Sequence, residues 1–388
     1  MTTFQDTDQV AGDFYARHFQ EGAEPGTLIL NMGPQHPSTH GVLRIVLEVD
    51  GEYIVRADPV IGYLHRMHEK IGESKSWLQF VPNLGRVDYG HALAWNWAYM
   101  ACLERLGGIE VPERAEYLRV ITCEMNRLTS HLLWWGAYLL DLGAFTPIMY
   151  AFEDREILLD LLQIPTGSRL TYSSFRPGGV VKDVDDRFIE GTREFIKRFR
   201  TRLPMYKDLV TDNIILRKRV EEVGYIDADC CRRYGCTGPV ARGAGIDFDL
   251  RKSEPYSIYD RFDFNVPVYT ECDAMARYMV RLDEMAESCK IIEQALDQMP
   301  EGEHIIEKPL KAMWKAPKGE AYAAVEGGRG SVGIYLVSDG SKTPYRLKLR
   351  APGYSNLSCF AEVSAGTLIA DAVAILGSLD LIIPEIDR

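Results

Sequence analysis

The sequence predicts an α+β fold in which antiparallel strands from both ends of the chain flank a helical middle. Three β-like stretches follow one another near the N-terminus, at 27–33, 42–50 and 52–60. Apolar residues then recur at helical spacing through much of 89–299, and further β-like stretches occupy 319–351. We therefore expect the two terminal groups of strands to pack near each other.

The N-terminal strands carry a local hairpin signal. The stretch VLRIVLEVD partly alternates apolar and polar residues, as a half-buried strand does. Asp50 and Gly51 stand between the second and third stretches, and Asp-Gly is a strong tight-turn signal. The first two stretches are joined by a loop rich in Gly, Pro and His, GPQHPSTHG at 33–41.

The rest of the chain divides into a helical and a second β-rich part. We expect helices at 89–106, 112–142, 146–162, 183–202 and 269–299, and a final helix at about 364–377. We expect strands at 319–327, 330–339 and 345–351. The expected organisation is a polar arm (1–26), an N-terminal β region (27–60), a helical bundle (61–317), and a C-terminal β region with the final helix (318–388). We interpret 27–388 as one interleaved domain.

Bulk composition excludes several classes of protein. The net charge of −12 argues against a nucleic-acid binder, which would normally show a basic face. The sequence contains no run of 18 or more apolar residues and therefore predicts no membrane span. The acidic N-terminus lacks a targeting signal, so we expect a cytoplasmic protein. None of the eight cysteines forms a CxxC pair, and we read the local group Cys230, Cys231 and Cys236 as free thiols rather than a metal site. The role of this group stays open.

Four residues could carry acid–base chemistry. His36 and His40 lie in the loop 33–41, where a histidine could be presented rigidly to a cavity with a pKa suited to proton delivery, or could simply face solvent. Asp141 interrupts an apolar run; it could face solvent, or it could be buried and pair with a histidine such as His40. Tyr89 offers a hydroxyl that could donate to a carbonyl, or it could be a core tyrosine.

Two arginines are further candidates. Arg66 and Arg86 stand in mixed segments, where a buried guanidinium would need a partner or an electronegative cofactor nearby. Surface exposure is the alternative for both. Other motifs are absent: the chain has no P-loop and no HExxH, and GGRGSVG at 327–333 lacks the spacing of a nucleotide site.

Long collinear strings nevertheless resemble one known family, the quinone-site subunit of complex I-type NADH:quinone oxidoreductases, called D, 49 kDa or, in the photosynthetic relative, H. The strings that carry the resemblance are GPQHPSTHGVLR (33–44), DPVIGYLHRMHEKI (58–71), RVDY (86–89), ITCEMNRLTSHLLWWGAYLLDLGAFTP (121–147), MVRLDEMAESCKIIEQAL (279–296) and SDGSKTPYRLKLRAP (338–352). The resemblance covers the chain from about residue 27 to its end.

The resemblance implies a fold like that of the large subunit of nickel–iron hydrogenases, to which this family is homologous. Those enzymes bind their metal through two CxxC pairs. The corresponding segments here read GRVDYGHA (85–92) and GSLDLIIPEIDR (377–388) and contain no cysteine, so this chain is expected to bind no metal itself.

The resemblance also assigns roles. His40 and Tyr89 would hydrogen-bond the two quinone carbonyls and donate protons, and Asp141 would partner His40. His36, Arg66 and Arg86 would line the quinone pocket or the surroundings of an iron–sulfur cluster held by a neighbouring subunit. The implied activity is quinone reduction coupled to proton translocation, in a large complex with a cluster-bearing B-type subunit, C- and I-type subunits and a membrane H-type subunit, at the cytoplasmic face of the membrane. The chain would not be active alone.

Three departures from the family pattern stand out. Thr171 stands where many members have a histidine, which implies a lower-potential cluster and favours menaquinone. Met67 replaces a usual glycine and is followed by His68, a titratable group of unknown role. The stretch between Met299 and Lys318 is shorter than in many respiratory members, which suggests a compact variant with different electron-input partners. A ferredoxin- or F420-linked homologue and a scaffold without chemistry remain as alternatives.

Overall fold

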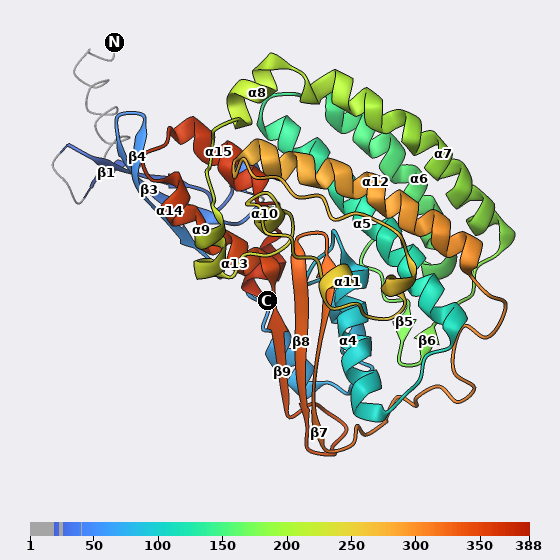
Figure 1. The fold of residues 1–388 in the computed structure, drawn as a ribbon. Coiled ribbons are helices and arrows are strands. Elements are labelled where there is room, and N and C mark those ends of the chain that lie inside the picture. Colours follow the sequence, from blue (N-terminus) through green and yellow to red (C-terminus); the bar gives the residue numbers. More distant parts are fainter. Residues whose placement is uncertain (1–18, 23–25, 40) are drawn as a thin grey trace, which may run out of the picture.

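The computed structural model describes residues 19–22, 26–39 and 41–388, and its first part is a four-stranded antiparallel sheet (Figure 1). Its strands are in sequence order: β1 (Phe19–Glu21), β2 (Leu28–Met32), β3 (Arg44–Asp50) and β4 (Tyr53–Val60). The predicted hairpin is confirmed: Asp50 pairs with Tyr53, and Gly51 has a φ of 59°, which glycine adopts without strain. Strand β1 falls within the segment expected to be an arm; most of that segment lies outside the described residues.

Five long helices form the middle of the molecule. They are α4 (Ala92–Gly107), α5 (Glu113–Asp141), α6 (Thr146–Thr166), α7 (Asp186–Tyr206) and α12 (Ala274–Gln298). Helix α5 lies against α6 on one side and α12 on another, and is buried along most of its length (Figure 1). The predicted helices are all present, although α12 begins later than expected. The carboxylate of Asp273 caps it by accepting a hydrogen bond from the amide of Ala276 at 2.7 Å.

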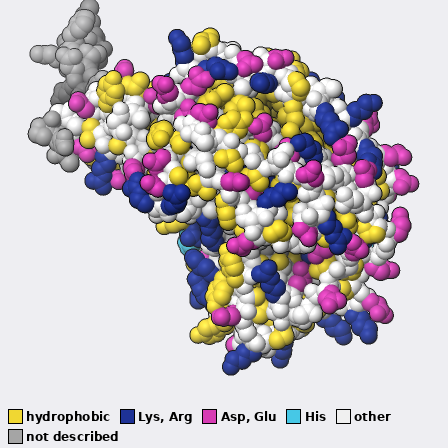
Figure 2. Space-filling model, in the orientation of Figure 1, with side chains coloured by type: hydrophobic (Ala, Val, Ile, Leu, Met, Phe, Trp, Pro, Cys, Tyr) yellow, Lys and Arg dark blue, Asp and Glu magenta, His cyan; other side chains and the backbone are white. Residues whose placement is uncertain are grey.

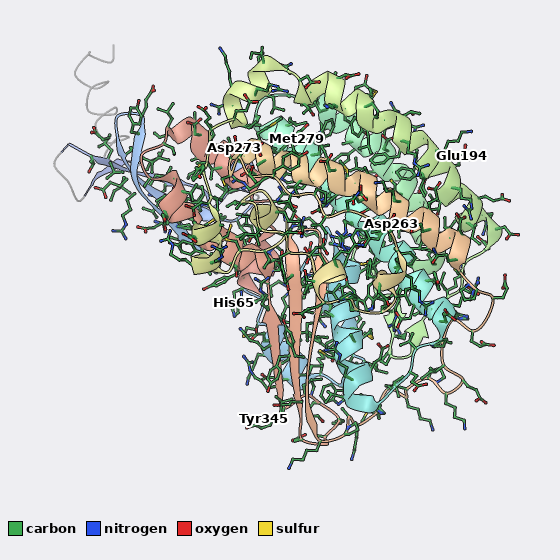
Figure 3. The ribbon with its side chains drawn as sticks, viewed as in Figure 1. His65, Glu194, Asp263, Asp273, Met279 and Tyr345 are labelled. Atoms are coloured by element: carbon green, nitrogen blue, oxygen red, sulfur yellow. The ribbon has the colours of Figure 1, made fainter. Side chains whose placement is uncertain are left out.

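Shorter elements, which the sequence pattern did not predict, precede or connect these helices. They are α2 (His68–Ser74), α3 (Val81–Leu84), β5 (Phe175–Arg176), β6 (Gly179–Val180), a π-helical turn (Lys207–Thr211), α8 (Ile214–Val220), α9 (Ala228–Tyr234), α10 (Pro239–Arg242) and α11 (Leu250–Ser253), with single 3-10 turns at Pro37–Thr39 and Tyr259–Arg261. Figure 3 labels Asp273 and Met279 near the beginning of α12, close to the α8 and α15 end of the bundle.

The C-terminal part forms a second sheet and a group of short helices. Its elements are β7 (Gly319–Gly327), β8 (Gly330–Ser338), β9 (Arg346–Arg350), α13 (Pro352–Ser358), α14 (Phe360–Ser364), α15 (Ile369–Ser378) and α16 (Ile383–Asp387). Helix α4 packs against β7 and β8. The expected packing of strands from both ends takes another form: the two sheets are separate, and the N-terminal sheet packs through β4 against helix α14.

The apolar core has two parts. The larger lies among the long helices and the β7–β9 sheet. The smaller joins β2, β3 and β4 to helices α9, α10 and α13–α16. All eight cysteines are buried and form no disulfide, and five of them pack in the smaller core. Residues from both ends of the chain therefore pack in the smaller core.

Helices α15 and α5 approach each other closely at Gly377. The indole nitrogen of Trp134 donates to the Gly377 carbonyl at 2.7 Å, and the Tyr138 hydroxyl donates to the Ala374 carbonyl at 3.1 Å. A Cβ atom added to Gly377 would stand 2.5 Å from the Tyr138 ring, so only glycine fits without a shift of the helix.

Candidate functional site

Tyr89 lies in the loop between α3 and α4, and its side chain is 40% exposed. The phenol makes no hydrogen bond within the described part of the chain. Its neighbour Asp88 is buried and holds the loop in place, because its carboxylate accepts hydrogen bonds from the amides of Gly90 at 2.8 Å and His91 at 3.0 Å. The loop is therefore rigid beneath an accessible hydroxyl.

Arg329 connects this loop to the C-terminal part of the chain. It occupies the turn between β7 and β8, and its guanidinium donates to both carboxylate oxygens of Asp88, at 3.0 and 3.2 Å. The same guanidinium donates to Asp380, which follows α15, at 3.3 Å. Arg281 of α12 stands 3.9 Å from the other Asp380 oxygen. Segments 85–92 and 377–388 thus meet at Arg329.

Glu385 of α16 completes this group of charged side chains. One of its carboxyl oxygens accepts a hydrogen bond from the amide of Gly353 at 3.1 Å; the other has no partner in the described residues. Burial, followed by the neighbouring charge of Asp88, raises the pKa of Glu385 to about 8. Partial burial also raises the pKa of Tyr89 above its ordinary value. We call Asp88, Arg281, Arg329, Asp380 and Glu385 the Arg329 cluster.

His91, at the start of α4, is a buried neutral histidine. Its Nδ1 accepts a hydrogen bond from the amide of Gly328 at 2.8 Å, so the proton resides on Nε2, which donates to the Cys123 carbonyl at 3.1 Å. Burial and the charge of Arg127 hold its pKa well below the ordinary range. His91 therefore serves as a structural link between α4, α5 and the β7–β8 turn.

Asp141 is the last residue of α5 and is half-buried. Burial raises its pKa to about 6, and the charge of His36 acts in the opposite direction. His36 itself is exposed, and its Nδ1 accepts a hydrogen bond from the amide of Ser38 at 3.2 Å. His40 lies outside the described residues, so its pairing with Asp141 stays a prediction.

Comparison with known proteins identifies the family. The family model described as the 49 Kd subunit of respiratory-chain NADH dehydrogenase matches residues 141–316 and 310–388. The D-type subunit of NADH-quinone oxidoreductase from Desulfotalea psychrophila is 60% identical over 362 residues, covering 93% of this chain and 97% of that protein. A D-type subunit from Opitutus terrae, the one numbered 2, is 55% identical, covering 93% and 90%. The D-type subunit from Geobacillus thermodenitrificans is 48% identical, covering 93% and 98%. The chain belongs to this D-type, or 49 kDa, family.

Both arginine candidates of this D-type chain are exposed. Arg86 bonds to the carbonyl of Pro82 at 2.6 Å, which leaves the rest of its guanidinium accessible. Arg66 precedes α2. Burial is the main cause that lowers the pKa of His68 to about 4, and the positive charge of Arg66 is the second cause. The His68 ring is buried with both nitrogens unpartnered in the described residues.

The segment that holds Arg66 borders a hollow of about 470 Å³. Figure 2 shows Lys and Arg side chains and a histidine along the left-hand margin, beneath the N-terminal sheet, and Figure 3 labels His65 there. The residues that line this hollow include His65, Lys70, Arg346, Lys348 and Arg388. Glu69 offsets part of this charge by accepting from Arg346 at 2.9 Å and Lys348 at 3.0 Å.

A second group of buried charges, which sequence reasoning missed, lies behind His91. Glu124 accepts from Arg127 at 3.0 Å, Arg251 at 3.2 Å, the Tyr259 hydroxyl at 2.7 Å and the Ser288 hydroxyl at 2.7 Å. These four partners hold the pKa of Glu124 far below its ordinary range despite complete burial.

The same network continues along α12. Glu284 bonds to Nε2 of His131 at 2.8 Å and accepts from Arg242 at 2.9 Å, and Arg242 also donates to Glu326 of β7 at 2.9 Å. No local pattern could have revealed these pairs, because their partners lie far apart in sequence.

Two kinds of feature are absent from the part of the chain that the structure describes. Within residues 19–22, 26–39 and 41–388, no three or more His, Cys, Asp and Glu side chains are arranged to hold a metal ion. None of the helices in those ranges is both long enough and apolar enough to cross a bilayer.

Proposed function

We propose that this chain forms the quinone headgroup pocket of a proton-translocating NADH:quinone oxidoreductase. The observation that carries the proposal is the accessible Tyr89 phenol, fixed above the buried Arg329 cluster. A phenol that the chain itself leaves unpaired is suited to donate a hydrogen bond to a carbonyl oxygen. The relatives are named as subunits of NADH-quinone oxidoreductase, which favours NADH over ferredoxin or F420 as the electron source.

The pocket derives, in this proposal, from the metal cavity of a hydrogenase-like ancestor. The two segments that would have carried cysteine pairs meet at Arg329, but they contribute Asp88 and Asp380. Carboxylates paired with a guanidinium are hard, already neutralised ligands and do not suit a nickel–iron centre, which needs thiolates. The chemistry of these side chains thus fits a proton-handling site.

Tyr89 and His40 are the proposed donors to the two quinone carbonyls. Reduction of a quinone consumes two electrons and two protons, and each donor would supply one proton. Asp141 is proposed to orient His40 and to stabilise its charged form. Its pKa of about 6 keeps it largely ionised at neutral pH, which this role requires.

An apolar hollow of about 390 Å³ offers room for the ring or the first part of an isoprenoid tail. It lies at the end of α5 and the beginning of α6, and its walls include Leu139, Leu142, Phe145 and Ile215. Large exposed apolar side chains at its rim, among them Phe145 and Ile215, favour a lipid-soluble substrate or an apolar partner.

Electrons are proposed to reach the quinone from an iron–sulfur cluster in a B-type subunit, with the exposed guanidinium of Arg86 facing that cluster. His36 and Arg66 would line the pocket entrance or the subunit boundary. Thr171, in place of a histidine, supports menaquinone as the substrate. The remaining partners would be C- and I-type subunits and a membrane H-type subunit, with this chain peripheral at the cytoplasmic face.

The test is the Tyr89→Phe variant in the purified complex, which loses only the hydroxyl. We expect quinone reductase turnover to fall by roughly a hundredfold or more, as for loss of a positioned proton donor. Tyr345→Phe, at an exposed tyrosine of the β8–β9 connection (Figure 3), is the matched control and should leave turnover unchanged.

A quinone-analogue inhibitor separates an enzyme site from a scaffold. We expect such an inhibitor to bind the wild-type complex and to protect Tyr89 from chemical modification. Wild-type turnover in the Tyr89→Phe complex, together with no protection, would leave the scaffold as the better interpretation.

A further inference from the structure

Strand β7 is an edge of the C-terminal sheet, and part of that edge is uncovered. In the antiparallel β7–β8 hairpin, alternate residues of β7 direct their backbone groups to β8, and the others direct them away from it. The carbonyl of Tyr322 points away, because it accepts a hydrogen bond from Arg105. The amide of Glu326 also points away and donates to the Tyr256 hydroxyl at 3.2 Å. Ala324, midway between them, therefore directs its own amide and carbonyl outwards.

Neither outward group of Ala324 forms a hydrogen bond within the described part of the chain. An open strand edge can recruit another strand, and proteins usually protect such edges with a proline, a bulge or a covering segment. Strand β7 contains no proline and pairs with β8 in unbroken register from Gly319 to Gly327. Since the strand carries no protection of its own, we expect the edge at Ala324 to be covered on assembly.

A hollow of about 590 Å³ runs along this edge and gives access to it. Residues 323–325 of β7 form one side, and helix α4, which packs against β7, contributes another (Figure 1). The remaining walls come from the beginning of α5 and from the segment 255–257. A peptide that entered the hollow would run beside Ala324, as in recognition by β-strand addition.

The charged residues that line the hollow favour a positively charged occupant. They are Glu104, Glu110 and Glu116 against Arg105 and Arg119. Arg119 donates to Glu104 at 2.6 Å and stands 3.7 Å from Glu116, and Arg105 is bonded to the backbone of β7. Both guanidiniums are thus already engaged. The exposed carboxylate of Glu110 has no ion pair within the described residues.

Glu116 would gain from a further cation. It is half-buried, and its carboxylate accepts from the Ser257 hydroxyl. Burial raises the pKa of Glu116, and the charge of Arg119 acts in the opposite direction. A lysine or arginine that entered the hollow would stabilise the ionised form of this carboxyl group.

We propose that β7 receives an extended, basic segment of a neighbouring subunit, which pairs with Ala324 and places a lysine or arginine against Glu110 and Glu116. The amide of the segment donates to the Ala324 carbonyl, and its carbonyl accepts from the Ala324 amide. A second copy of this chain is a poorer occupant, because pairing β7 with itself brings equal acids together. The inference does not depend on the role of Tyr89.

The first measurement is hydrogen exchange of backbone amides in the purified wild-type complex, resolved to single residues by mass spectrometry. We expect the Ala324 amide to exchange at least about a hundredfold more slowly than an unpaired amide. Glu320 directs its backbone outwards by the same alternation but lies outside the hollow, so its amide is the internal control and should exchange rapidly. If the two amides exchange equally fast, no strand covers Ala324 and the inference is wrong.

The second measurement is the salt concentration at which subunits leave the complex, followed by native mass spectrometry. Ala324→Pro removes the outward amide, which an edge strand tolerates. We expect one subunit to be bound roughly tenfold more weakly, because a backbone hydrogen bond is lost and the proline ring takes its place. Glu110→Lys should release the same subunit at lower salt, because it repels the basic segment.

Two matched controls should behave as wild type. Glu320→Pro introduces the same ring at an outward-facing position of β7 beyond the hollow. Glu194→Lys makes the same charge change as Glu110→Lys at an exposed carboxylate of α7 (Figure 3).

The outcomes separate this inference from the proposed quinone site. Retention of every subunit up to the wild-type salt concentration in Ala324→Pro and Glu110→Lys would overturn the inference, as would two copies of this chain joined through β7. If Ala324→Pro does not fold, unchanged retention in Glu110→Lys is sufficient to refute it. Tyr89→Phe should keep all subunits, so a failure of the quinone site would leave the docking site standing, and the reverse holds too.

Discussion

The guanidinium of Arg329 donates hydrogen bonds at 3.0 and 3.2 Å to the two carboxylate oxygens of Asp88, a residue 241 positions away in sequence. Both hydrogen bonds come from Nη1, and they tie the β7–β8 turn to the loop that presents Tyr89. The geometry of the proposed site therefore depends on long-range contacts between the middle and the end of the chain.

Arg329→Met should destabilise the protein by about 3–5 kcal/mol, because it leaves the buried carboxylates of Asp88 and Asp380 without their partner. The effect is measured by heating the purified complex and recording the temperature at which this chain is lost from it. Arg232→Met removes an exposed ion pair with Asp229 and should change little. Equal stability of the two variants would contradict the importance assigned to the Arg329 cluster.

Asp141→Asn should remove a pH dependence from quinone reduction. The pKa of Asp141 is raised to about 6, so the wild-type carboxylate loses its charge as pH falls through 6, and we expect turnover to fall with it. The variant should be slow at pH 7 and flat between pH 5 and 7. Turnover profiles of both proteins provide the measurement, with Asp229→Asn, an exposed carboxylate, as the control. If the turnover of the variant still fell below pH 6 as that of the wild type does, Asp141 would not be the cause of this fall.

Met67→Gly should stabilise the protein by about 0.5–1 kcal/mol. Met67 precedes α2 with φ 53° and ψ 40°, a left-handed conformation that costs a residue with a Cβ atom roughly 1–2 kcal/mol. Glycine avoids this cost but loses about 0.4–1 kcal/mol more chain entropy on folding. Met149→Gly is matched in exposure, 57% at both positions, but lies inside α6 and should destabilise. Thermal shifts of opposite sign are expected; a lower melting temperature for Met67→Gly would refute the argument.

Glu124→Gln should remove part of the acid sensitivity of the fold. The folded-state pKa of Glu124 lies far below its unfolded value, so its contribution is present above about pH 4.3 and is lost as pH falls towards the folded value. The variant should be about 3–5 kcal/mol less stable at pH 7, because Arg127 and Arg251 lose their shared partner. The difference from wild type should narrow in acid. Acid-unfolding curves of both proteins measure this difference in stability. A difference that stayed the same at every pH would contradict the role assigned to Glu124.

Local sequence patterns were sufficient for the long helices and the main strands. The Asp50-Gly51 turn, the β7–β8 hairpin and the long helices α5 and α6 all depend on residues close in sequence, and their predicted bounds lie within a few residues of those observed. The start of α12 was placed too early, because the capping side chain of Asp273 and not the apolar stripe decides where the helix begins.

The candidate site was accessible to sequence reasoning only in part. Family resemblance pointed to Tyr89 and Asp141, but composition and spacing gave no sign of Arg329, Asp380 or Glu385. Arg329 lies in the β7–β8 turn, whereas Asp380 and Glu385 lie in the C-terminal segment 377–388, and the contacts of Arg329 with Asp88 and Asp380 span distant parts of the chain. The His131–Glu284 pair, 153 residues apart, was invisible for the same reason.

The close approach at Gly377 has a consequence for how such a protein can change over evolution. Asp380 follows Gly377 by three residues, and the distance between its carboxylate and Arg329 depends on how deeply α15 settles against the Tyr138 ring. A methyl group at this buried position would push α15 away from the Tyr138 ring and separate Asp380 from Arg329. Natural variation should therefore be tolerated less at this glycine than at many surface residues nearer the proposed pocket.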